Sequence, residues 1–302
     1  MKRYCLYLFI LIGISCSAEL KAQKNGTIYK GNDPAVRYTG RTLVSPDGSV
    51  AFDWVGTYLE TRFTGGRLSV KVSETGTSYY NVFVDGKLHK VVKVCGTDTL
   101  IHLVSGIDKR IHSLKIQKRS EGEFGKTTVH QFVLSGSGRL AEEPAVRTRH
   151  IEFIGNSLTC GYGTDGKHRD EPFLVETENC NLTFASMVAR YYDADYTLIA
   201  HSGRGAARNY GDSVRVSKVT MKDRMLNTFD EDLTHKWNFK EYRPDLVVIN
   251  LGSNDFSTEP HPYKSEFTKA YKQILAQLRE HYGDIPILCI YPVAMQAPVF
   301  SY

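Results

Sequence analysis

Hydrophobic and polar residues alternate along most of residues 24–140, the pattern of strands that bury only one face. Apolar side chains take every second position at 68–72, 114–116 and 132–134. Asp85-Gly86 separates two strand-like runs and predicts a tight hairpin turn. Turn residues recur at short intervals, and no helical stretch of useful length interrupts them. This half of the chain is therefore predicted to be an all-β domain, a jelly-roll-like β-sandwich.

The pattern changes after residues 141–149, a charged stretch with a proline at 144 that we interpret as a linker. Beyond it, apolar runs alternate with segments of helical periodicity, which predicts a parallel sheet covered by helices. The expected strands are 151–154, 196–200, 246–251 and 285–291. The expected helices have apolar faces made by Phe184, Met187, Val188 and Tyr191 and by Phe267, Tyr271, Ile274, Leu275 and Leu278, the first capped by Asn181 or Thr183 and the second ending at Gly283. Residues 150–302 are thus predicted to form a three-layer α/β/α domain.

The first residues have the layout of a secretory signal peptide. Met1-Lys2-Arg3 precedes an apolar run that is too short to span a membrane, and small residues follow it. We expect cleavage after Ala22, with Ala18 as the alternative, so residues 1–22 are read as a leader of an exported protein. A lipid anchor at Cys16 is a second possibility, although Gly13 stands where such signals usually have a larger aliphatic residue.

Net charge and cysteine content narrow the function classes. The formal charge is +5, and removing Lys2, Arg3, Lys21 and Glu19 lowers it to +3, without a clustered basic stripe. This balance does not indicate nucleic-acid binding. Cys160 and Cys180 have a spacing that permits a disulfide, but sequence alone does not establish the pairing. No cysteine spacing predicts a metal site, no cofactor is expected, and Cys289 is expected to be a buried thiol in a strand.

Aromatic residues of the β-rich half could serve either of two roles. Trp54, Tyr58, Tyr79 and Tyr80 would bind carbohydrate if exposed, as in many secreted enzymes. Packing within or at the edge of the domain is the interpretation we favour for them.

Small polar turns follow three of the predicted parallel strands. The first turn is Gly155-Asn-Ser157, the second is His201-Ser-Gly203, and the third is Gly252-Ser-Asn254. Sequential parallel strands tend to be neighbours, and ligands bind at their carboxyl ends. Ser157, Gly203 and Asn254 are therefore expected to converge at one edge of the sheet. A serine nucleophile needs donors for the oxyanion of a tetrahedral intermediate, and a glycine N–H and an asparagine amide are suitable.

These three turns resemble blocks I, II and III of the SGNH (GDSL-type) hydrolases. A closer similarity is to carbohydrate esterase family 2, carried by 156–163, 202–210, 237–239 and 243–256. The resemblance implies an N-terminal β-sandwich and an exported acetyl xylan esterase-like enzyme that removes O-acetyl groups from hemicellulose sugars. It also implies that Ser157 is the nucleophile and that the N–H groups of Ser157 and Gly203 and the amide of Asn254 form the oxyanion hole.

Two departures from the family pattern stand out. Asn156 replaces the usual aspartate of Gly-Asp-Ser. The catalytic histidine of a C-terminal Asp-x-x-His block is not present in the expected position, so the last strand and helix are expected to be missing as well. His201 and His261 are conceivable substitutes, but we interpret the first as bonded to backbone at a strand end and the second as a solvated loop residue. His168 is read as a surface group, and Asp165 and Asp255 as loop-stabilising carboxylates.

Two functions follow from these observations. The leading hypothesis is a serine esterase acting on acetylated polysaccharide or oligosaccharide, represented by a C-terminally incomplete chain. The alternative is a non-catalytic carbohydrate-binding protein on a decayed hydrolase fold. A lipase-like activity is disfavoured because no extended apolar lid is evident.

Overall fold

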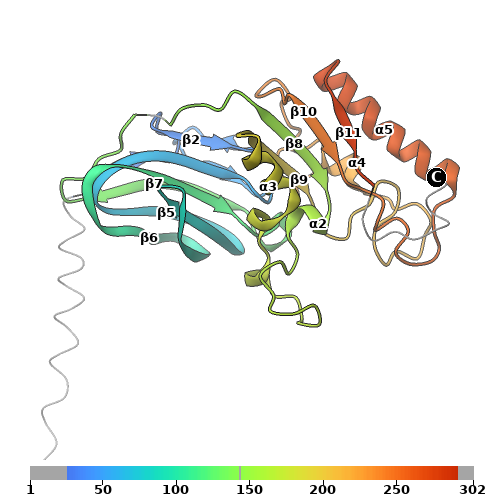
Figure 1. The fold of residues 1–302 in the computed structure, drawn as a ribbon, viewed down its shortest axis with the longest axis horizontal. Coiled ribbons are helices and arrows are strands. Elements are labelled where there is room, and N and C mark those ends of the chain that lie inside the picture. Colours follow the sequence, from blue (N-terminus) through green and yellow to red (C-terminus); the bar gives the residue numbers. More distant parts are fainter. Residues whose placement is uncertain (1–25, 143, 292–302) are drawn as a thin grey trace, which may run out of the picture.

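The computed structural model describes residues 26–142 and 144–291. The predicted leader, Cys16 and the segment after Tyr291 lie outside these residues. The first half forms a seven-stranded antiparallel sheet, and the second half forms a parallel sheet with the order β11-β10-β8-β9 (Figure 1). The antiparallel strands are β1 (Thr27–Lys30), β2 (Val36–Thr39), β3 (Leu43–Val44), β4 (Val50–Phe52), β5 (Tyr58–Val84), β6 (Lys87–Lys118) and β7 (Thr127–Ser135).

The antiparallel sheet curls around its own core because two long strands pair more than once. Tyr80 of β5 pairs with both Val92 and Lys118 of β6. Asp85 and Gly86, with φ of 49° and 76°, make the hairpin turn between these strands, as predicted. The alternating side chains of β5, β6 and β7 gather in one apolar cluster that includes Phe63, Leu68 and Phe132. The β-domain predicted from alternation is confirmed.

The parallel sheet contains β8 (His150–Gly155), β9 (Asp195–Ala200), β10 (Leu246–Ile249) and β11 (Ile287–Cys289). β8 lies between β9 and β10 and pairs in parallel with both, so the first three predicted strands are neighbours, as expected. Successive residues within each strand face different clusters. Ile154, Ile199 and Ile249 pack with α5 (Lys264–Tyr282) and α4 (Met221–Arg224), whereas Phe153, Leu198 and Val248 pack with α3 (Phe184–Tyr191). Helices therefore cover both faces of this sheet.

Helix α3 has the predicted bounds but not the predicted buried face. Met187 and Tyr191 are 55% and 84% exposed, and the face that packs on the sheet is formed by Ala185 and Ala189. Of the expected stripe, Phe184 alone reaches the core, edge-on to Phe153. The small side chains let this helix approach the sheet closely. The periodicity of large apolar residues does not predict such a close approach. Thr183 occupies the N-cap position without a side-chain cap bond.

Helix α5 follows its prediction more closely. Ile274 and Leu278 are buried, Phe267 and Tyr271 pack partly against the same cluster, and Gly283 is the C-cap. None of the described helices is both long and apolar enough to cross a membrane.

The cysteine predictions are partly wrong. Cys289 is exposed and lies in β11, one of the two outer strands of the described sheet. Cys160 and Cys180 are both buried and are free thiols, so the disulfide left open by their spacing is not formed in the structure. The Sγ of Cys180 instead contacts the carbonyl oxygen of Lys118 at 3.4 Å.

The two domains share a buried boundary. Trp54, Tyr58 and Tyr80 are 0%, 1% and 3% exposed, which confirms packing as their role, and Tyr79 is half-buried. Trp54 and Tyr58 belong to the apolar clusters of the parallel sheet, although they come from the β-domain. The predicted linker also takes part, since the guanidinium of Arg147 contacts Asp195 at 2.8 Å.

Candidate active site

Ser157 is the first residue of a short helix, α2 (Ser157–Cys160), directly after β8. The side chain of Asn156 caps this helix by accepting from the N–H of Leu158 at 3.3 Å and donates through Nδ2 to Ser253 Oγ at 3.0 Å. A Cβ on Gly155 would lie 2.0 Å from Thr159 Oγ1, so glycine is needed where the helix turns back on the strand. The serine is half-buried at the carboxyl end of the sheet.

Gly203 lies in the turn after β9 and has φ of 75°, a conformation that favours glycine. Its carbonyl oxygen accepts a hydrogen bond from the N–H of Tyr210 at 2.8 Å, which closes the turn into a loop. Within the part of the chain that the structure describes, neither the N–H of Gly203 nor that of Ser157 donates a hydrogen bond. Both groups are thus available to an incoming acceptor.

Asn254 follows β10 and is 8% exposed. Its amide Nδ2 donates to the carbonyl oxygen of Arg204 at 2.8 Å, so the third loop is tied to the second. The next residue, Asp255, accepts from the backbone N–H groups of Ala206, Ala207 and Arg208 at 3.0, 2.6 and 2.9 Å. Asp255 is therefore a loop-stabilising carboxylate, as predicted. The loops that carry the three expected site residues are hydrogen-bonded to one another.

The other acidic residue singled out from the sequence also holds a loop. Asp165 receives both the guanidinium of Arg119 and the amide of Asn179, with Nδ2 of the latter 3.1 Å from Oδ2. It is a structural carboxylate, as expected.

No histidine within residues 26–142 and 144–291 is hydrogen-bonded to Ser157. His168 is exposed, as predicted. His261 is half-buried, and its Nδ1 lies 3.4 Å from Glu259 Oε1. His201 was expected to bond to backbone, and this is wrong. It is buried, with Nδ1 2.7 Å from Asp230 Oδ2 and Nε2 3.5 Å from Glu123 Oε2.

The surroundings of His201 exclude it as a general base. Burial alone would lower its pKa, but the charges of Asp230 and Glu123 outweigh burial and raise the pKa to about 10. Such a histidine already carries its proton at neutral pH and has no free ring nitrogen to accept another. Its role is to hold the carboxylates of two segments together.

Two exposed tyrosines flank the loops, and the sequence analysis did not assign them to the site. Tyr162 is 49% exposed and stacks on Phe173 with ring centroids 3.7 Å apart. Tyr210 is 63% exposed and is bonded to the Gly203 turn. The signal available in the sequence was their position within the stretches that carry the family resemblance.

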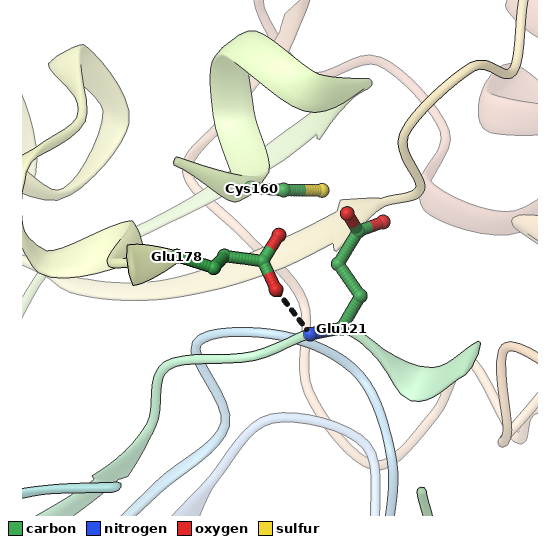
Figure 2. Close-up of side chains that lie close together, drawn as sticks. All are labelled: Glu121, Cys160 and Glu178. Carbon is green, nitrogen blue, oxygen red and sulfur yellow. Dashed lines mark hydrogen bonds between the residues drawn. The ribbon is translucent and has the colours of Figure 1, made fainter. Parts of the chain in front are cut away.

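A buried group of possible metal ligands lies beside the loops. Ligand atoms of Glu121, Cys160 and Glu178 lie within 4.8 Å of one another, and the three side chains point toward a common centre in Figure 2. Both carboxylate oxygens of Glu121, however, accept hydrogen bonds from Ser202, and Glu178 Oε2 accepts the N–H of Glu121. Only Glu178 Oε1 lacks a partner among the carboxylate oxygens. These hydrogen bonds indicate that the three side chains form a contact between the two domains and not a metal site.

Comparison with known proteins agrees with this architecture. The model of the GDSL-like Lipase/Acylhydrolase family matches residues 153–302, and the Carbohydrate esterase 2 N-terminal model matches 38–144. The fold and its three loops thus define a GDSL-like acylhydrolase domain joined to a β-domain. A family two carbohydrate esterase from Clostridium thermocellum, solved with cellohexaose, superimposes with a TM-score of 0.82 and 33% identity over 87% of this chain and 79% of that chain. An active site mutant of a family two carbohydrate esterase from the same organism gives a TM-score of 0.80 and 34% identity over 85% of this chain and 76% of that chain. The protein belongs to carbohydrate esterase family 2.

Curated relatives include longer proteins. The cellulase/esterase CelE of Acetivibrio thermocellus is 34% identical over 85% of this chain but over only 31% of its own length. An acetylxylan esterase / glucomannan deacetylase of Cellvibrio japonicus is 33% identical over 72% of this chain and 61% of its own. The chain thus spans about a third and about three fifths of these relatives.

Proposed function

We propose that the protein is a serine carboxylic ester hydrolase that removes O-acetyl groups from hemicellulose sugars. One observation carries the proposal. Ser157, whose N–H and hydroxyl have no partner among the described residues, opens α2 in a loop that is hydrogen-bonded to the Asn254 loop. The Asn254 loop is in turn bonded to the Gly203 turn. A nucleophile accompanied by two backbone N–H groups that donate to no described residue, those of Ser157 and Gly203, suits acyl transfer through a tetrahedral intermediate.

In the proposed reaction, Ser157 Oγ attacks the carbonyl carbon of the acetyl group and gives up its proton to a general base. The N–H groups of Ser157 and Gly203 and the amide of Asn254 donate to the oxyanion, each worth about 3 kcal/mol. As the intermediate collapses, the protonated base gives its proton to the leaving sugar oxygen, which releases the sugar hydroxyl and leaves acetyl-serine. Water then attacks acetyl-serine with loss of a proton to the base, and the base returns that proton to Ser157 Oγ as acetate leaves. The general base is not assigned to any described residue.

The proposed substrate is a polysaccharide or oligosaccharide. Exposed Tyr162 and Tyr210 beside the loops offer aromatic faces of the kind on which sugar rings stack. The names of the relatives support this class, since they include acetylxylan esterases, a glucomannan deacetylase and a structure in complex with cellohexaose.

We also propose three features that rest on the sequence and the family. The protein is exported by its N-terminal leader, with a lipid anchor at Cys16 as the alternative. The β-domain is a jelly-roll-like sandwich, and the second domain has α/β/α layers. No part of the chemistry requires a metal or an organic cofactor.

Acetate release from acetylated xylan tests the proposal. The parent protein is compared with Ser157→Ala and with Ser265→Ala, which changes an exposed serine in the first turn of α5. Release should disappear with Ser157→Ala and persist with Ser265→Ala, after circular dichroism has shown all three to be folded. The alternative is tested by electrophoresis through a gel that contains acetylated xylan. A folded parent that is slowed by the xylan but releases no acetate would support the non-catalytic binding protein.

A further inference from the structure

The last residue of β6 and the three residues that follow it are buried, although all four are polar. Lys118, Arg119, Ser120 and Glu121 are 0%, 2%, 0% and 0% exposed. Polar residues at the end of a strand are usually in water, and burying them is costly unless each finds partners. The side chains of Lys118 and Ser120 are hydrogen-bonded within the β-domain, whereas those of Arg119 and Glu121 reach mainly into the second domain. Arg119 and Glu121 are thus inserted beside the loops that carry Ser157 and Gly203.

One end of the segment holds the Gly203 turn. The carboxylate of Glu121 accepts from the N–H of Ser202 at 2.5 Å and from the Ser202 hydroxyl, using both of its oxygens. Ser202 directly precedes Gly203, whose N–H is a proposed oxyanion donor. Two bonds to one carboxylate fix both the backbone and the side chain of the residue that sets the direction of that N–H.

The same segment is anchored to the loop that follows Ser157. Glu121 donates its N–H to Glu178 Oε2 at 2.9 Å (Figure 2), and Arg119 Nε donates to the carbonyl oxygen of Glu178 at 2.6 Å. Cys160, at the end of α2, faces the two carboxyl groups. Burial and the charge of Glu121 raise the pKa of Glu178 well above its usual range, so this carboxyl group takes up a proton more readily than an exposed one.

We propose that Glu121 is a positioning residue for the esterase site: the β-domain, through this side chain, holds the Ser202–Gly203 turn where its N–H can reach the oxyanion. This inference rests on the proposed function and extends it to a residue of the other domain. It gives the β-domain a part in the reaction, because the turn has no other side chain that accepts from Ser202 within the described residues.

Four variants separate positioning from folding. Glu121→Ala removes both bonds, whereas Glu121→Gln keeps an acceptor for the N–H and a donor for the hydroxyl oxygen. Ser202→Ala removes one of the two bonds. The matched control is Glu74→Ala, because Glu74 is also a buried carboxylate of the β-domain, 6% exposed, and accepts from Thr127 Oγ1 at 2.5 Å within that domain.

In the activity arm, Glu121→Ala should lower kcat for acetate release about tenfold or more with KM nearly unchanged, because an oxyanion donor acts in the transition state. Ser202→Ala should show a smaller loss, Glu121→Gln should recover most of kcat, and Glu74→Ala should leave kcat at the parental value even if it melts earlier. Parental kcat in folded Glu121→Ala would overturn the proposal.

Hydrogen exchange of the peptide spanning residues 202–208 is a second measurement, and it does not depend on catalytic activity. Glu121→Ala should exchange about tenfold faster there than the parent, and Glu121→Gln and Glu74→Ala should remain near the parental rate. Equal exchange in Glu121→Ala and Glu74→Ala would overturn the positioning role. If the parent releases no acetate, the esterase proposal fails for this chain, and exchange alone still decides whether Glu121 holds the turn.

Discussion

Two regions join the β-domain to the parallel-sheet domain, and they do so by opposite chemistry. In one, Trp54, Val55 and Tyr58 enter the apolar clusters on the two faces of the parallel sheet. In the other, Arg119 and Glu121 are buried against polar groups of the loops that carry Ser157 and Gly203. The apolar contact stabilises the protein in proportion to the apolar surface area that it buries, and it has little directional preference. The polar join depends on angles and distances, so it sets the position of a loop at little net gain in stability.

The apolar join lies along β9, an outer strand of the parallel sheet in the described part of the chain. Trp54 packs on one face and Tyr58 on the other, and the backbone between them passes so close that a Cβ on Gly56 would lie 2.6 Å from Leu198 Cδ1. The β-domain thereby covers a sheet edge that would otherwise offer unpaired backbone to other chains. Stability and protection from aggregation are the contributions expected of this region.

The largest predicted effect breaks the apolar join. Trp54→Ala should lower the free energy of unfolding by about 3–5 kcal/mol, because it removes a fully buried indole and leaves a cavity. The loss should be the same at pH 6 and pH 9, since no titrating group is removed. Urea unfolding followed by tryptophan fluorescence and circular dichroism measures it. Tyr191→Ala, at a side chain 84% exposed, is the control and should change stability by less than about 0.5 kcal/mol.

A smaller loss for Trp54→Ala, below about 1 kcal/mol, would mean that the two domains fold independently of this contact. The apolar contact would then not be the one that stabilises the two domains against each other.

The second predicted effect belongs to the ionic contacts at the same boundary. His201 of the parallel-sheet domain is close to Glu123 of the β-domain and is paired with Asp230. Its pKa is raised from 6.5 to about 10, so its charge stabilises the folded state fully below pH 6.5 and the contribution is lost as pH rises toward 10. His201→Asn should therefore cost about 3 kcal/mol at pH 6 and progressively less at pH 8 and above.

The measurement is the difference in urea midpoint between parent and His201→Asn across pH 6 to 10. His168→Asn, at an exposed site, is the control and should show no such trend. A difference that stays constant over this range would show that His201 acts by packing and not by charge.

The smallest predicted effect sits at the solvent-facing rim of the polar join. The Tyr79 hydroxyl donates to Glu176 Oε2 at 3.3 Å, and both groups are accessible to water. Tyr79→Phe should change the free energy of unfolding by less than about 0.5 kcal/mol, because water replaces the lost bond. The same urea titration tests this. A decrease in the free energy of unfolding above about 1.5 kcal/mol would show that this exposed contact stabilises the protein as much as the buried ones do.

Patterns local in the chain predicted much of the architecture. Alternation defined the β-domain, Asp85-Gly86 its hairpin, and apolar runs followed by glycine-containing turns the strands β8, β9 and β10. Each of these depends on residues within about ten positions of one another, so the physical cause is present in the local sequence. Asp255 was also predicted correctly, from its residue type in a turn, although the N–H groups from which it accepts lie 47 to 49 positions away, in the turn after β9, and β8 separates β9 from β10.

The errors arose where a residue's surroundings come from distant parts of the chain. Helix α3 buries alanines because the sheet lies close beneath it, and Cys289 is exposed in an outer strand of the described sheet. His201 meets a carboxylate 29 positions away, and Glu121 meets Ser202 across 81 positions. Neither the periodicity nor the spacing of residues in the sequence reveals that these distant residues are in contact.

The sequence by itself therefore determined the two domains, the strand-end turns and the placement of Ser157 at one of them, because these follow from local backbone and hydrophobic preferences. Tertiary structure alone decided which polar groups are buried together, which histidine keeps its proton and which side chain of the β-domain reaches the Gly203 turn. Burial and electrostatic interaction depend on three-dimensional distance, and tertiary packing, within each domain and between the two, sets that distance.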